Sequence, residues 1–79
     1  MSEASELVVL IARALVDRAD DVHVEEIPGQ RGTVLELAVA KEDIGKVIGK
    51  DGRTAQAIRT VLSAATAKSG RRVQLDIVD

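Results

Sequence analysis

The alternation of apolar and polar residues divides the chain into segments with helical spacing and segments with strand spacing. The first, from Ser5 to about Arg18, has the helical period and predicts an amphipathic helix that ends at Ala19-Asp20-Asp21. Its expected apolar stripe is Leu7, Leu10, Ile11, Ala14 and Leu15, with Glu6, Arg13 and Asp17 opposite. Ser2 or Ser5 is suited to cap its first turn.

The next segments predict a β-hairpin. Val22 to Ile27 is rich in β-branched residues, and Thr33 to Val39 alternates, with Leu35 and Leu37 on one face. The turn cluster Pro28-Gly29-Gln30-Arg31-Gly32 separates them.

The second half returns to helical spacing and closes on a strand. Lys41 to Ile48 predicts a short helix, and Gly49-Lys50-Asp51-Gly52 interrupts it. Arg53 to about Ser69 predicts a second helix, which Gly70 ends. The expected apolar stripe of this second helix is Ile58, Val61, Leu62 and Ala65. Arg72 to Val78 alternates as a strand.

The order α-β-β-α-α-β predicts an α+β fold in which three helices cover one face of a three-stranded sheet. Residues 1–79 leave room for a single domain. The chain has no Phe, Trp or Tyr, so its core must be aliphatic, and it lacks the aromatic platforms on which many RNA-binding domains stack bases. The polar N-terminal segment and the short apolar runs lead us to expect a soluble, cytoplasmic protein without membrane contact.

Charge is distributed unevenly along the chain. The formal net charge is −2, yet residues 1–43 carry a balance of −6 and residues 44–72 a balance of +6. This contrast predicts one acidic and one basic surface, so the acidic total does not exclude a nucleic-acid partner.

The basic part contains the most informative motif, a four-residue turn flanked by glycines between two helices. Glycine permits positive φ and lets a ligand approach the backbone closely, and the N-terminus of the following helix attracts anions. Lys46, Lys50 and Arg53 surround this turn. The predicted RNA-binding residues are Gly45, Lys46, Ile48, Gly49, Lys50, Asp51, Gly52 and Arg53.

An aliphatic groove is expected beside the turn. Its predicted lining is Ile44, Val47 and Ile48, together with Val34 or Leu35. Such a narrow site favours single strands over a duplex. Two residues have alternative interpretations. Asp51 either caps the helix that begins near Gly52 or faces the ligand, and Gly45 serves either helix packing or close approach by RNA. Arg59, Lys68, Arg71 and Arg72 are expected to form a solvated basic surface.

The stretch Val47-Ile48-Gly49-Lys50-Asp51-Gly52 matches the V-I-G-x-x-G signature of KH domains, in the type II order of elements. With Arg31 to Leu37 and Gly52-Arg53-Thr54-Ala55, the chain resembles the KhpA (YlqC) family of small bacterial single-KH proteins. The resemblance implies binding of single-stranded RNA with low sequence selectivity. It also implies a homodimer or a pairing with a second KH protein such as KhpB (Jag), and a role as RNA chaperone or post-transcriptional regulator.

Other functions are less consistent with the sequence. The glycine-lysine stretch is one residue short of a P-loop and lacks its Ser or Thr. Without cysteine and with His23 alone, no nucleophile–base pair or metal cluster is apparent, so we expect no enzyme, cofactor or metal. Two alternatives remain: a helix-turn-helix DNA binder, and a dimerisation module with a vestigial RNA groove.

Overall fold

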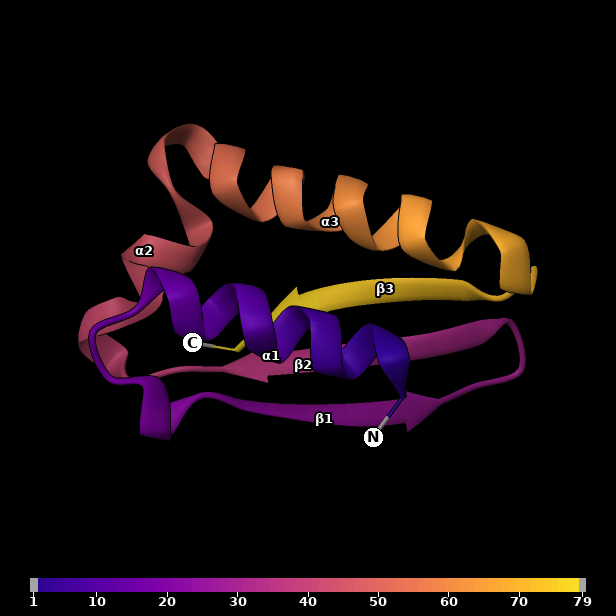
Figure 1. The fold of residues 1–79 in the computed structure, drawn as a ribbon, viewed down its shortest axis with the longest axis horizontal. Helices are drawn as coiled ribbons and strands as arrows, with labels where there is room; N and C mark the ends of the chain where they lie inside the picture. Colours follow the sequence, from indigo (N-terminus) through magenta and orange to yellow (C-terminus); the bar gives the residue numbers. More distant parts are fainter. Residues whose placement is uncertain (1, 79) are drawn as a thin grey trace.

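The computed structural model describes residues 2–78 and contains a three-stranded mixed sheet packed against helices (Figure 1). Strand β1 (His23–Pro28) pairs antiparallel with β2 (Gly32–Ala38), and β2 pairs parallel with β3 (Arg72–Ile77). The central strand is therefore β2. The predicted hairpin and α+β class are confirmed, with each strand boundary within one residue of its expected position.

Helix α1 (Glu3–Leu15) begins and ends earlier than the sequence predicted. The hydroxyl of Ser2 accepts the N–H of Ser5 at 3.1 Å, which makes Ser2 the cap. Val16 is already extended, so the helix does not reach Arg18, and Ala19–Asp21 forms a separate 3₁₀ turn, η1.

The apolar stripe expected on α1 is partly wrong. Val8 and Ala12 are buried in the core, whereas Leu10 is 68% exposed. Ala14 and Leu15 are exposed as well, and Leu7 and Ile11 are half-buried. The helix therefore faces the sheet along Ser5, Val8 and Ala12, where two small side chains permit close packing.

The remaining helices follow the predicted interruption. A 3₁₀ turn, η2 (Lys41–Asp43), leads into α2 (Ile44–Ile48). After η3 (Lys50–Gly52), helix α3 (Arg53–Thr66) runs beside α1, and η4 (Ala67–Ser69) ends at Gly70 in a left-handed conformation. On α3, Ile58 and Leu62 are buried as predicted, but Val61 is 46% exposed and Ala65 is exposed.

The core is aliphatic, as the composition required. Its most deeply buried members come from helices and sheet alike and are Val8, Ala12, Leu35, Leu37, Val47, Leu62 and Leu75. Where β2 begins, a Cβ on Gly32 would lie 2.1 Å from the carbonyl oxygen of Arg72. Glycine at this position thus allows β3 to pair closely with β2.

Candidate nucleic-acid interface

The turn between α2 and α3 has a backbone that few residues other than glycine adopt. Gly49 has φ 78° and ψ 172°, Asp51 has φ 57° and ψ 24°, and Gly52 has φ 74° and ψ 12°. A Cβ on Gly49 would lie 2.2 Å from Oγ1 of Thr54, so this glycine lets the turn pack directly on the first residues of α3.

Two backbone N–H groups of the turn are already used. Gly49 donates to the carbonyl oxygen of Gly45 at 2.9 Å, and Gly52 donates to that of Gly49 at 3.1 Å. Within residues 2–78, the N–H groups of Lys50 and Asp51 have no hydrogen-bond acceptor. They are therefore available to an anionic ligand at the tip of the turn.

Charge at the turn comes from exposed side chains. Lys50 and Arg53 are exposed, and neither forms an ion pair within the described part of the chain. Of the two interpretations of Asp51, the one in which it caps α3 is wrong: Gly52 occupies the cap position, and no side chain bonds there. The Asp51 carboxylate instead remains exposed beside two cations, where it offsets part of their attraction for phosphate.

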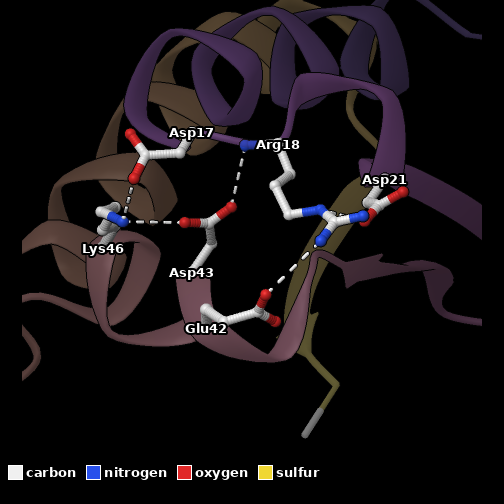
Figure 2. Close-up of polar contacts among 6 residues, drawn as sticks. All are labelled: Asp17, Arg18, Asp21, Glu42, Asp43 and Lys46. Carbon is white, nitrogen blue, oxygen red and sulfur yellow. Dashed lines mark hydrogen bonds and ion pairs between the residues drawn. The ribbon is translucent and has the colours of Figure 1, made fainter.

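Gly45 and Lys46 lie on α2, just before the turn. A Cβ on Gly45 would meet no atom within 4 Å, so tight packing does not explain this glycine. The ammonium of Lys46 is engaged: its Nζ lies 2.8 Å from Oδ2 of Asp17 and 2.8 Å from Oδ1 of Asp43 (Figure 2). These carboxylates raise the pKa of Lys46, Asp17 more than Asp43.

A groove of about 530 Å³ adjoins the turn. Its apolar lining comes from Ile48, Ala55, Ile77 and Val78, and Gly52 joins it to the turn. Ile48 and Gly52, both among the predicted RNA-binding residues, line this groove. Val47 and Leu35 are fully buried in the core and do not line the groove, which corrects the predicted lining. Ile44 is half-buried and, like Val34, lies outside the lining.

Sequence reasoning missed the contribution of β3 to this groove. The alternation of Val73, Leu75 and Ile77 predicted a strand but did not show that this strand forms the sheet edge beside α3. The parallel pairing of β3 with β2 places Ile77 and Val78 there. A signal was present, because a final strand that follows a helix favours a parallel crossover.

Three charged side chains border the groove. Arg59 donates from Nε and Nη2 to the carbonyl oxygen of Leu75, each at 3.2 Å, so its guanidinium is held against β3 rather than fully solvated as expected. Glu36 and Asp76 are paired across β2 and β3 and also border the groove. Carboxylates repel phosphates, so the groove suits bases and the turn suits the sugar-phosphate backbone.

A second cavity of about 370 Å³ lies away from the turn, between the start of α1 and the end of α3. None of the predicted RNA-binding residues lines it. At its edge, Glu26 accepts hydrogen bonds from the backbone N–H of Ser2 and from the hydroxyl of Ser5. Hydrogen bonds from these two serines lower the pKa of Glu26 to about 2.

The described residues contain no helix long and apolar enough to cross a membrane. Nor do residues 2–78 bring together three or more His, Cys, Asp or Glu side chains in a way that could hold a metal ion.

The order of elements, the glycine-flanked turn and the adjoining groove define a KH domain. The family model for the KhpA/KhpB KH domain matches residues 5–77. The chain therefore belongs to the KhpA/KhpB KH-domain family.

Several relatives carry the name RNA-binding protein KhpA. The one from Clostridium perfringens is 53% identical over 73 residues, 92% of this chain and 97% of the relative. The one from Borreliella burgdorferi is 51% identical over 94% of this chain and 90% of the relative. The one from Aquifex aeolicus is 48% identical over the full length of both.

A solved structure is also similar. The crystal structure of Aquifex aeolicus Era bound to GDP and AlF4⁻ superposes with a TM-score of 0.60 at 26% identity. The match covers 94% of this chain but 29% of the Era chain. The similarity therefore concerns one part of Era.

Proposed function

We propose that this protein binds single-stranded RNA, with the sugar-phosphate backbone on the Gly49–Gly52 turn and bases in the adjoining groove. The observation that carries the proposal is that the basic turn and the apolar groove are adjacent, because Gly52 belongs to both. On one side lie Lys50, Arg53 and two available N–H groups; on the other lies an apolar groove. Relatives named RNA-binding protein KhpA support the choice of ligand.

Low sequence selectivity is expected because one such groove holds about four nucleotides. Bases would be held there by aliphatic contact with Ile48, Ala55 and Ile77, since the chain has no aromatic side chain on which to stack them. Asp51 and the carboxylates beside the groove support a modest affinity. The proposed activity is binding without catalysis.

A KH groove accommodates about four nucleotides, which limits the affinity of one domain. We therefore propose that the protein acts as a homodimer or beside a second KH protein of the KhpB type. Two linked sites raise the effective concentration of the second contact. The family model covers the KH domains of both KhpA and KhpB, which makes a second KH protein of this family the candidate partner. A role as RNA chaperone or post-transcriptional regulator would suit weak and unselective binding.

An interaction module with a vestigial groove is the second candidate. It is favoured by apolar side chains exposed on the two neighbouring helices, Leu10 at 68% on α1 and Val61 at 46% on α3. A helix-turn-helix DNA binder is disfavoured, because α2 has only five residues.

Fluorescence anisotropy with labelled single-stranded RNA and with duplex DNA of equal length distinguishes these three candidate functions. The proposal expects binding to single-stranded RNA with much weaker binding to the duplex. Preference for duplex DNA would favour the helix-turn-helix, and binding to neither would favour the interaction module.

A further inference from the structure

The helix that carries the turn is tied to the segment that follows α1. Helix α2 has only five residues, too few for a helix to be stable by itself. Its orientation must therefore come from contacts with other elements. Figure 2 shows such contacts on its N-terminal side, between residues 17–21 and residues 42–46.

Asp43 is the centre of these contacts. Its side chain is 2% exposed, and its two oxygens accept separate donors. Oδ2 accepts the backbone N–H of Arg18 at 3.0 Å, and Oδ1 accepts Nζ of Lys46 at 2.8 Å. The hydrogen bond from Lys46, followed by that from Arg18, keeps the pKa of Asp43 below its usual value.

Lys46 completes the connection, because its ammonium also reaches Asp17 at 2.8 Å. A move of Lys46 toward an RNA phosphate would break both ion pairs and leave the buried Asp43 carboxylate short of a donor, which is costly. The guanidinium of Arg18 joins the same two segments a second time. Its Nη1 lies 3.5 Å from Oε2 of Glu42, and its Nε lies 2.9 Å from Oδ2 of Asp21.

We propose that Asp17 and Asp43, acting through Lys46, are positioning residues that hold α2 and the Gly49–Gly52 turn in the geometry that binds RNA. Lys46 is a tether between elements, and it does not contact phosphate. This inference rests on the proposed function, and it assigns the side-chain contacts with phosphate to Lys50 and Arg53 alone.

The sharpest test removes an acidic side chain. Loss of a carboxylate makes the protein less negative, so electrostatics alone predict equal or tighter RNA binding. The proposal expects the opposite for Asp17→Ala: a loss of about threefold to tenfold, since the turn loses its support. Asp17 is 81% exposed, so this variant is expected to fold, which circular dichroism checks.

Asp20→Ala is the matched control. Asp20 is exposed, lies like Asp17 between α1 and β1, and has no ion pair within the described residues. It should bind RNA as tightly as the unaltered protein, or slightly tighter. Equal affinities for Asp17→Ala and Asp20→Ala would overturn the positioning role.

Salt dependence tests whether Lys46 touches phosphate. Each phosphate contact contributes about 0.7 to the slope of log affinity against log salt for single strands. Lys46→Met should lower the RNA affinity and leave the salt slope unchanged, whereas Lys50→Met should make the slope shallower by about 0.7. Lys46→Arg keeps the positive charge and should have most of the affinity of the unaltered protein. A shallower slope in Lys46→Met would show that Lys46 is a phosphate ligand.

Amide chemical shifts separate this inference from the proposed function. The shifts of Gly49 to Gly52 should change in Asp17→Ala but not in Asp20→Ala, even without RNA. If the unaltered protein binds no RNA, the proposed function fails, while these shifts still decide whether the network positions the turn. Unchanged shifts in both variants would overturn the inference.

Discussion

At the scale of single residues, Lys50 is the cation best placed to hold phosphate. It lies in the turn, is exposed, and has no ion pair within residues 2–78. Lys50→Asp replaces attraction by repulsion and should weaken RNA binding by about tenfold or more. Anisotropy titration measures the loss, and circular dichroism should show an unchanged helical signal.

Lys68→Asp is the matched control for this charge reversal. Lys68 is also exposed but lies in η4, at the far end of α3. If both reversals weakened binding equally, the effect would come from overall charge, and the turn would have no special role.

Gly49 and Gly45 form a second matched pair, at the level of the backbone. A Cβ at Gly49 would meet Thr54 at 2.2 Å, and φ is positive there, whereas at Gly45 it would meet nothing within 4 Å. Gly49→Ala should therefore lower the free energy of unfolding by about 1–3 kcal/mol. Gly45→Ala, inside a helix, should leave it unchanged or raise it by up to about 1 kcal/mol.

Thermal denaturation of the two alanine variants measures this difference. A Gly49→Ala protein as stable as Gly45→Ala would mean that the turn has room to move away from α3. In that case the fixed shape of the turn would not be a basis for RNA binding.

At the scale of elements, the pattern of residues predicted which segments are helices and strands but not how each one faces its neighbours. Residues 7–12 are all apolar, so the sequence alone fits several choices of buried helix face. The face that packs is the one with the small side chains of Ser5 and Ala12. The turn was predictable because its residues are consecutive. The groove was not predictable, because Ile77 and Val78 line it only when β3 is the edge strand next to β2, and the sequence pattern does not give the order of strands.

Glu26 makes the junction between β1 and α1 sensitive to acid. Its pKa falls from 4.5 to about 2 because Ser2 and Ser5 donate hydrogen bonds to it. A lowered pKa in the folded state means stabilisation that is present above pH 4.5 and lost as pH falls toward 2. Glu26→Gln should therefore be less stable than the unaltered protein at neutral pH, and this difference should shrink in acid.

Urea unfolding across this pH range checks the prediction, with Glu25→Gln as control. Glu25 is the neighbouring residue of β1 and accepts no hydrogen bond to its side chain within residues 2–78. The control should follow the pH dependence of the unaltered protein. A constant difference between Glu26→Gln and the unaltered protein would contradict a role for Glu26 ionisation.

At the scale of the whole molecule, the proposal requires an acidic protein to attract RNA to the Gly49–Gly52 turn. The chain carries a net charge of −2, and its turn offers Lys50 and Arg53 once Lys46 is held by Asp17 and Asp43. If Lys46, Lys50 and Arg53 each contacted one phosphate, as the sequence suggests, the slope of log affinity against log salt would be about −2, at about 0.7 per contact. Two available cations give a slope of about −1.4.

Affinity measured over a series of salt concentrations distinguishes these values, provided that protein concentration is kept low enough to hold one oligomeric state. A dimer that placed two turns on one RNA would double the contacts and steepen the slope to about −2.8. Single-site behaviour should therefore give about −1.4 on a four-nucleotide RNA and a steeper value on RNA long enough to reach a second turn. A slope near zero on both would contradict backbone binding at the turn, because phosphate contacts cannot form without releasing counterions.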